Sequence, residues 1–333
     1  MPRLPRPPLR RAARTRGEAG ARPAEPDTPN VEVVEAEGLR WINIERPRQI
    51  DRAWLEEHFD FHPLDYEDVF SRNQRPKVDE YEGYLFVVLH FPVFDKRVNR
   101  LNGAEIDIFV GPDFLVTLPN EPLQPLNYLF ERVRASEEVR EDLFNKGAGY
   151  LLYKVVDACV DASFPMLRKM GAKLDQLEDD IFEGRSAKIV EEISNAKQEI
   201  INFRRVVRPM RAVLRDLERT KQRYLQEDLD IYFDDITDAA ERIWDVLENY
   251  KEVAEALEDS NESVLSHRLN ESLRVLTAFS VAMLPLTLLA SVFGMNVPLP
   301  GQQGSPTEFW VIVALMAATL LGVLLFFRRR GYL

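Results

Sequence analysis

Cysteine is almost absent from the sequence. Cys159 is the only one in 333 residues, so the chain cannot form an internal disulfide and offers no Cys-x-x-Cys pair or Cys/His cluster for zinc. A disulfide-stabilised extracellular domain is therefore excluded, and we expect the soluble part in the cytosol. His58 and His62 lie four apart, but Pro63 follows directly, so a surface or helix-capping role is expected rather than a metal site. A glycine-rich phosphate loop, a nucleophile constellation and a signal peptide are also missing, and we expect no enzyme.

Acidic residues outnumber basic ones outside the first 30 positions. Residues 1–30 carry seven Arg against three acidic residues, which leaves a net charge of about −16 on the rest of the chain. An acidic body argues against nucleic acid as a partner and suits cations. Residues 1–30 also contain seven prolines and few large apolar residues, so we expect a disordered tail there.

Uncharged stretches of membrane length occur only near the C-terminus. Val275–Phe293 and Phe309–Phe327 each contain 19 residues without a charge, close to the ~20 that carry a helix across the hydrocarbon core of a bilayer. Arginines flank this pair on both outer sides, whereas the connecting loop contains only Glu308 as a charged residue. By the positive-inside rule both termini are cytoplasmic, and we expect a two-helix hairpin surrounded by lipid in the plasma membrane.

Turn residues and apolar periodicity divide the remainder of the chain. Residues 31–145 alternate short β-branched or aromatic runs with helical spacing, which predicts a cytoplasmic α/β domain. Its expected strands are Leu39–Ile44, Tyr84–Phe91, Glu105–Val110 and Phe114–Leu118, and its expected helices are Ile50–Phe59 and Pro63–Phe70. Residues 146–272 predict a helical hairpin, Tyr150–Phe182 and Ala187–Leu225, and a long stalk helix. The stalk helix would start at Asp228 and run to Phe293. Its last part would lie inside a transmembrane domain of residues 273–333.

The expected stalk helix carries a dense acidic stripe. Between Gln226 and Glu262 there are 14 acidic and two basic residues, and most of the acids follow alternating steps of three and four. Apolar residues with the same spacing predict helix-on-helix packing on another side. They are Ala239, Ile243, Val246, Tyr250, Val253 and Leu257. Like charges at this spacing repel one another, so the stripe is either a solvated face or a surface neutralised by bound cations.

The three-four alternation continues along the first apolar segment. It places seven residues on one face: Asn270, Leu273, Thr277, Ser280, Leu284, Thr287 and Ser291. A stripe of hydroxyl and amide groups on an apolar helix either packs against another helix or lines an aqueous path. Two helices per chain cannot enclose a pore, so permeation would require a ring of subunits.

The tripeptide Gly294-Met295-Asn296 follows this helix and precedes the last apolar segment with its basic end. In this position, and together with Gln74–Val78, Tyr150–Tyr153 and Asn270–Thr277, it resembles the CorA family of divalent cation channels from about Trp41 to the C-terminus. The resemblance implies a CorA-like pentameric funnel, a homopentamer that passes hydrated divalent cations passively. The ion would be chiefly Mg²⁺, with Co²⁺ and Ni²⁺ as alternatives, and no organic cofactor is implied.

The resemblance also implies roles for single residues. Gly294, Met295 and Asn296 would form a selectivity ring, whose neutral amide oxygens hydrogen-bond the water shell that Mg²⁺ keeps. Asn270 would form a second polar ring, and Leu273, Leu276 and Leu284 would be constrictions that gate the pore. Intracellular Mg²⁺ would bind between subunits as a feedback brake. Asp68 and Asp259 would form one such site, and Glu67, Asp157 and Asp235 would contribute to a second.

The loop after Asn296 departs from the family pattern. Many members have an acidic loop there, whereas Val297–Gly304 contains no acidic residue, so the order of preference among Mg²⁺, Co²⁺, Ni²⁺ and Zn²⁺ is left open. Met295 favours the magnesium branch over ZntB-like zinc transporters, which usually vary this position. The alternatives are a proton-coupled zinc transporter on the same fold and a membrane-anchored oligomeric sensor or scaffold without ion flux.

Overall fold

The computed structural model describes residues 28–71, 74–95, 100–183, 188–219, 229–295 and 306–330. Most of the expected tail and of the 294–308 loop, including Asn296, lies outside these ranges. Contacts divide the chain into two compact units. The sheet unit contains Met1–His90, Ala104–Ala158 and Arg215–Phe233, and the helical unit contains Phe91–Gly103, Cys159–Leu214 and Asp234–Leu333. The domain boundaries expected at residues 145 and 272 remain predictions.

Six strands form one sheet in the order β1-β2-β6-β5-β4-β3. They are β1 Glu32–Ala36, β2 Leu39–Asn43, β3 Lys77–Glu80, β4 Leu85–Asp95, β5 Arg100–Val110 and β6 Phe114–Pro119. Strands β2 and β6 pair in parallel, and the pairs β1–β2, β3–β4 and β5–β6 are antiparallel. The four strands expected from the sequence are confirmed, and with the helices they confirm the α/β class.

The two edge strands, β1 and β3, were not predicted. Glu32 and Glu35 flank two valines in β1, and Lys77, Asp79 and Glu80 make up most of β3. Charged side chains on short edge strands prevent pairing with other chains. The same charges remove the apolar run by which a strand is recognised in a sequence.

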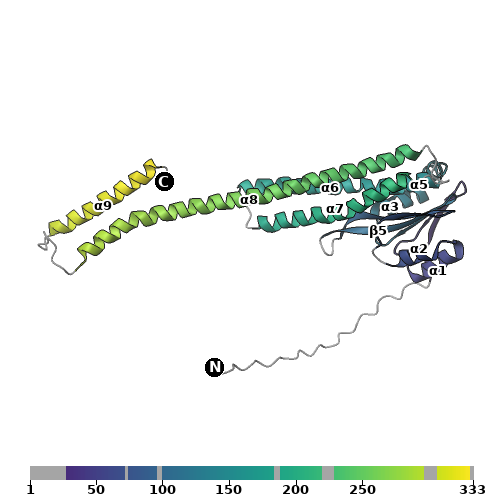
Figure 1. Ribbon diagram of the computed structural model, residues 1–333, viewed down its shortest axis with the longest axis horizontal. Helices are drawn as coiled ribbons and strands as arrows, with labels where there is room; N and C mark the ends of the chain where they lie inside the picture. The colour runs from purple at the N-terminus through teal and green to yellow at the C-terminus, as the bar shows by residue number, and fades with distance from the viewer. Residues whose placement is uncertain are drawn as a thin grey trace, which may run out of the picture. The chain divides into compact units, whose positions relative to one another are not determined.

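Helices cover both faces of the sheet (Figure 1). On one face, α1 (Gln49–His58) and α2 (Pro63–Phe70) contribute Leu55 and Tyr66 to a buried cluster with Phe86 and Phe109 of the sheet. On the other face, α3 (Gln124–Ala135) places Phe130 edge-on against Trp41, with ring centroids 4.9 Å apart. Helix α3 and the following α4 (Glu137–Phe144) were not predicted.

The two neighbouring histidines take the roles expected of them. His62 is the N-cap of α2, and its Nδ1 accepts a hydrogen bond from the backbone N of Leu64 at 3.3 Å. This bond satisfies one of the amide groups that a helix start leaves open. His58 lies at the end of α1, where its ring stacks on Trp54 with centroids 4.1 Å apart. The capping role is thus confirmed for His62.

The helix expected over Tyr150–Phe182 is wrong as a single element. It divides at Ala162 into α5 (Ala148–Asp161) and α6 (Ser163–Glu183). Pro165 explains the break, because a proline lacks the amide hydrogen and its ring clashes with the carbonyl four residues earlier, here that of Asp161. Helix α7 (Ile189–Arg219) follows, and Pro209 lies inside it.

Helix α8 (Asp230–Phe293) is 64 residues long, which confirms the continuous helix expected between Asp228 and Phe293. Its soluble half packs along α6 and α7 (Figure 1) through buried residues at steps of three and four. These are Ile236, Ala240, Ile243, Leu247, Ala254 and Leu257. Of the expected apolar stripe, Ala239, Ile243 and Leu257 are buried, whereas Val246, Tyr250 and Val253 are only half-buried. The packing seam therefore lies slightly to one side of the predicted one.

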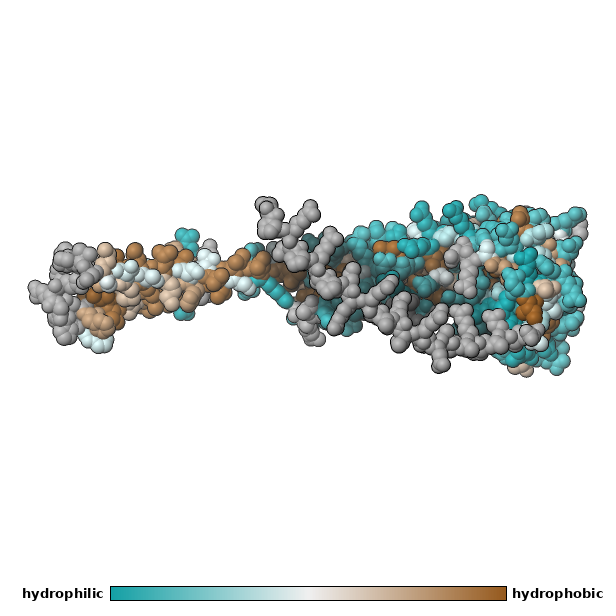
Figure 2. Space-filling model, turned by 90° about the horizontal axis from the view of Figure 1, so that it is seen from below, coloured by the Kyte–Doolittle hydropathy of each residue, from teal (hydrophilic) through white to brown (hydrophobic). Residues whose placement is uncertain are grey.

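The apolar half of α8 and the last helix, α9 (Pro306–Arg329), are mostly exposed. Both pass the length and hydropathy test for a membrane span, with 11% and 0% of their most apolar windows buried. Figure 2 shows brown apolar side chains over this part of the surface and mostly teal polar ones over the sheet and the soluble helices. Such exposed apolar surface is what two lipid-facing helices require.

Candidate functional site

The seven-residue polar face and Leu276 lie on the apolar half of α8. All eight residues are exposed on the single chain: Asn270, Leu273, Leu276, Thr277, Ser280, Leu284, Thr287 and Ser291. The buried residues of this half are Ala278 and Ala282, and Pro285 and Leu289 continue the row as half-buried residues. The first residues of the polar face share a pocket with α9, because Asn270, Leu273 and Thr277 line it together with Phe326 and Phe327. The later residues, Ser280, Leu284, Thr287 and Ser291, are exposed and do not line that pocket.

The hydroxyl groups of this face are held by the helix backbone. Ser280 Oγ donates to the carbonyl of Leu276, and Thr287 Oγ1 donates to the carbonyl of Met283, both at 2.9 Å. A hydroxyl that gives its hydrogen to the backbone still has lone pairs free. It therefore presents only an acceptor outward. Acceptors of this kind suit the hydrogen atoms of water bound to a cation.

The helix ends where the loop motif begins. Gly294 N donates to Ala290 O at 2.9 Å, and Met295 N donates to Val292 O at 3.3 Å, which closes the last turn. A Cβ built on Gly294 would lie 3.0 Å from the carbonyl oxygen of Ala290, so a larger residue would crowd this turn. Asn296, the expected ligand of the hydrated ion, lies outside the described residues.

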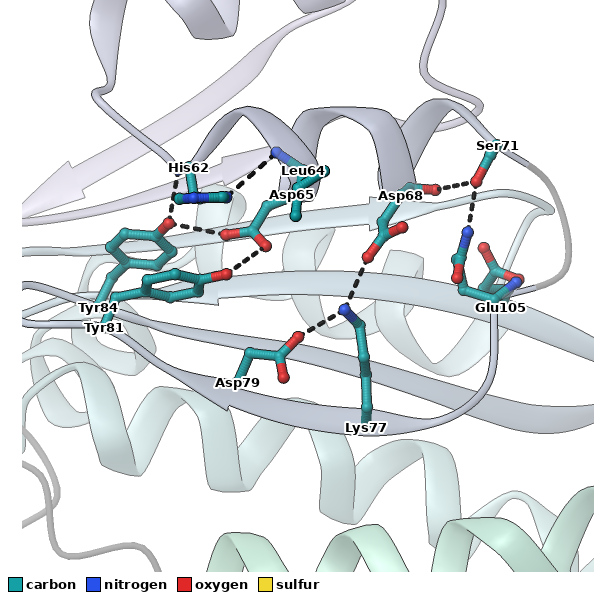
Figure 3. Close-up of polar contacts among 11 residues, drawn as sticks. His62, Leu64, Asp65, Asp68, Ser71, Lys77, Asp79, Tyr81, Tyr84 and Glu105 are labelled. Atoms are coloured by element: carbon teal, nitrogen blue, oxygen red, sulfur yellow. Dashed lines mark hydrogen bonds and ion pairs between the residues drawn. The ribbon is translucent and has the colours of Figure 1, made fainter.

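An acidic groove runs between α2 and β3 of the sheet unit (Figure 3). Its lining includes Asp65, Glu67, Asp68, Asp79 and Glu80, together with Leu64, Lys77 and Tyr81. Lys77 Nζ lies 2.7 Å from Asp68 Oδ2 and 2.5 Å from Asp79 Oδ2. Burial lowers the pKa of Lys77, but the bonds to the two carboxylates outweigh it and raise the pKa above its usual value.

Asp65 is not available in this groove, because two tyrosines hold its carboxyl group. Tyr81 and Tyr84 donate their hydroxyls to it at 2.9 and 2.7 Å, and Tyr84 accepts the backbone amide of His62 at 2.7 Å. Burial raises the pKa of Asp65. Burial, and then the hydrogen bond to Asp65, raise the pKa of Tyr81 to about 12. The other carboxylates that line the groove are those of Glu67, Asp68, Asp79 and Glu80, of which Lys77 holds Asp68 and Asp79.

A further acid, Asp107, was not predicted as a site residue. It lies on β5, it is 0% exposed, and neither carboxyl oxygen has a hydrogen-bond partner in the described part of the chain. Burial raises its pKa well above the ordinary value, and the charges of Glu105 and Asp68 add to that effect. An acid between Ile106 and Ile108 in an apolar strand is a sequence signal that could have found it.

The other acids implied as regulatory ligands are Glu67, Asp157, Asp235 and Asp259. Asp157 forms an ion pair with Lys154 at 3.2 Å, and Glu67, Asp235 and Asp259 are exposed. Among the described residues no group of three or more His, Cys, Asp or Glu side chains is arranged to hold a metal ion. The pairings of Asp68 with Asp259, and of Glu67 with Asp157 and Asp235, therefore stay predictions that need neighbouring subunits.

The acidic stripe of α8 divides into two rows. Three bases of α7, seven residues apart, pair with three of its acids: Lys197 with Glu258 at 2.7 Å, Arg204 with Glu248 at 2.6 Å, and Arg211 with Glu241. A second row is exposed and makes no ion pair with any described residue. This unpaired row consists of Asp238, Asp245, Glu252 and Asp259. Part of the stripe is thus neutralised by the protein itself, which neither expected interpretation included.

Comparison with known proteins agrees with this arrangement. The family described as "CorA-like Mg2+ transporter protein" matches residues 36–329. YfjQ of Bacillus subtilis is 31% identical over 295 residues, which cover 88% of this chain and 89% of that protein. The cobalt/magnesium transport protein CorA of Thermotoga maritima is 28% identical, covering 88% and 83%. The solved CorA magnesium transporter of Methanocaldococcus jannaschii shares the fold, with a TM-score of 0.78, 20% identity and coverage of 90% and 93%. The chain therefore belongs to the CorA-like Mg²⁺ transporter family, a family of divalent cation transporters and not of enzymes.

Proposed function

We propose that the protein is a homopentameric channel in the plasma membrane that passes hydrated divalent cations, chiefly Mg²⁺, with both termini in the cytoplasm. The observation that carries the proposal is the polar face of α8, whose residues are all exposed on the single chain and of which Ser280, Thr287 and Ser291 lie outside the pocket shared with α9. An exposed polar stripe on a helix in lipid is costly unless it faces another subunit or water. A ring of subunits supplies both.

The chemistry of the face suits a cation that keeps its water. Mg²⁺ releases water reluctantly, so a pore that passes it quickly should bind the water and not the ion. The lone pairs of Ser280 and Thr287 accept hydrogen bonds from that water, and neutral oxygens do so without trapping the charge. In the same proposal Thr277, Ser291 and Asn270 extend the polar lining, and Leu273, Leu276 and Leu284 form rings that close by excluding water.

The motif Gly294-Met295-Asn296 forms the selectivity ring at the outer mouth in this proposal. Support comes from its place directly after the last turn of α8 and from family membership. Because the following loop contains no acid, recruitment of cations at the mouth depends on amide and carbonyl oxygens. In this proposal, the order of preference among Mg²⁺, Co²⁺ and Ni²⁺ depends on how strongly each ion holds its coordinated water.

Cytoplasmic Mg²⁺ closes the proposed channel by binding between subunits. Asp68 with Asp259, and Glu67 with Asp157 and Asp235, are the proposed ligands. The groove at Asp68 fits such an ion in one respect: its carboxylate oxygens already hold a cation, the ammonium of Lys77. Hard carboxylate oxygens are also the ligands that Mg²⁺ prefers.

Ion flux into liposomes tests the proposal. The purified protein is reconstituted, and Mg²⁺ entry is followed with an enclosed fluorescent indicator, with Co²⁺, Ni²⁺ and Zn²⁺ as competitors. Asn296→Ala should reduce Mg²⁺ entry at least tenfold, and undiminished entry would overturn the proposal. Zn²⁺ entry that depends on a pH gradient would instead favour the zinc transporter, and a dimer without flux would favour the sensor or scaffold.

A further inference from the structure

The ammonium group of Lys77 occupies the groove at Asp68 (Figure 3). It bridges Asp68 on α2 and Asp79 on β3, at 2.7 and 2.5 Å. The side chains of all three residues are partly exposed, at 32%, 22% and 38% for Lys77, Asp68 and Asp79, so ions from the solvent can reach them. The groove is therefore already occupied by a positively charged side chain of the protein itself.

The backbone and a neighbouring ring fix where this cation lies. Lys77 pairs with Val88 across β3 and β4, and its ammonium lies 5.2 Å from the centroid of the Phe86 ring. A tethered group of this kind competes at an effective concentration of about the millimolar range or above. Free Mg²⁺ must therefore displace an ammonium that is always present.

Ammonium and Mg²⁺ compete for the Asp68 carboxylate, because the two positive charges repel and each weakens the attraction of the carboxylate for the other. Asp79 gives the displaced ammonium a second carboxylate within reach. A lysine has a flexible stem of four carbons, so it can release Asp68 and keep Asp79. The ammonium of Lys77 thus has two bound positions: one in which it contacts both Asp68 and Asp79, and one in which it contacts Asp79 alone.

We propose that Lys77 is a tethered competitor that sets the Mg²⁺ concentration at which the Asp68 site fills. Mg²⁺ binds Asp68 only when the ammonium moves to Asp79 alone. The inference rests on the proposed role of Asp68 as a Mg²⁺ ligand, and it adds the residue that determines the threshold. It makes opposite predictions for Lys77 and for its second partner, Asp79: loss of Lys77 lowers the threshold, and loss of Asp79 raises it.

Protease protection of the full-length protein measures the threshold without transport. The protein in lipid nanodiscs is titrated with MgCl₂, and the midpoint of protection from limited proteolysis is recorded. Lys77→Gln should lower the midpoint about tenfold, equal to about 1.4 kcal/mol. Lys77→Arg keeps the charge and should leave the midpoint within about twofold of the wild type. Asp79→Asn should raise the midpoint, because the displaced ammonium then lacks its second carboxylate.

Asp68→Asn separates the failure of this inference from failure of the proposed sensing role. Unchanged Mg²⁺ protection in Asp68→Asn would overturn the sensing role itself. If Asp68→Asn weakens protection but Lys77→Gln leaves the midpoint unchanged or raises it, only the competitor role is overturned. If Lys77→Gln fails to fold, Asp79→Asn decides the question. A lowered or unchanged midpoint in Asp79→Asn would then overturn the competitor role, which predicts a raised midpoint. In the double variant Lys77→Gln/Asp79→Asn, the effect of Asp79→Asn should shrink, because no ammonium needs a second partner.

Discussion

Replacement of Thr287 by valine tests the polar face of α8 at a single atom. Valine keeps the branched shape of threonine and its restricted χ1, so the helix is preserved. Thr287 is exposed, and its hydroxyl donates to Met283 O at 2.9 Å, which leaves its lone pairs as the only polar feature it presents. The substitution therefore removes one outward acceptor from each subunit and leaves the shape of the wall unchanged.

The size of the effect follows from the number of acceptors that Thr287 would contribute at this level of the proposed pore. A hydrogen bond contributes about 0.5–1.5 kcal/mol net. A hydrated ion that uses only two or three of the ring's acceptors at once loses about 1–1.5 kcal/mol at the lower value. Since 1.36 kcal/mol changes a rate tenfold, we expect Mg²⁺ flux to fall about tenfold.

Liposome flux under a fixed inward Mg²⁺ gradient provides the assay, and α9 provides a matched control. Thr319 makes the same backbone bond, to Leu315 O at 2.8 Å, but belongs to the other helix. Thr319→Val should therefore transport at the wild-type rate. Equal rates for Thr287→Val and the wild type, or equal losses in both variants, would refute the assignment of this face to the water path.

Two further predictions concern the sheet unit. Gly111→Ala should lower the free energy of unfolding by about 1–3 kcal/mol in a denaturation assay, because the new Cβ would overlap the Phe114 ring. The control is Gly83→Ala, where no atom lies within 4 Å of the new Cβ, and it should change the free energy of unfolding by less than about 0.5 kcal/mol. Asp107→Asn should stabilise the protein at pH 7. Because burial raises the pKa of Asp107, the native state holds a proton that the unfolded chain has lost, so wild-type stability falls as pH rises above the ordinary carboxyl value of 3.8, and the variant should lack this fall. Melting curves between pH 5 and 8 measure it, and a destabilised Asp107→Asn would mean that Asp107 is charged and paired.

The elements that the sequence predicted are those with long apolar patterns. The strands around Phe86 and Phe109 are almost wholly buried, so their runs are uninterrupted, and α8 has no glycine and no proline before Pro285. Helix α3 escaped prediction although Leu126, Phe130 and Val133 repeat at steps of four and three.

The candidate site was only partly predictable, because contacts across the chain decide it. Asp68 was identified through a family resemblance, but its partner Lys77 comes from β3, an edge strand with no apolar signal. Lys77 lies within the motif Gln74–Val78, which carried the resemblance without any role for the lysine. The pairing of the α7 bases with one row of α8 acids could not be predicted from the sequence either, because the paired residues lie 30 to 61 positions apart along the chain.

The unpaired acids and the polar face share one position of the heptad in α8. Asp238, Asp245, Glu252 and Asp259 repeat every seven residues, and the same count continues through Ser266 to Leu273, Ser280 and Thr287. In a straight α-helix a seven-residue row drifts by ~20° per repeat, so Asp238 and Thr287 would point about 140° apart. A left-handed supercoil removes this drift. The unpaired acids therefore line the same path as the hydroxyls only if the α8 helices of neighbouring subunits coil around one another. The other row of acids, Glu241, Glu248 and Glu258, is already neutralised by the bases of α7.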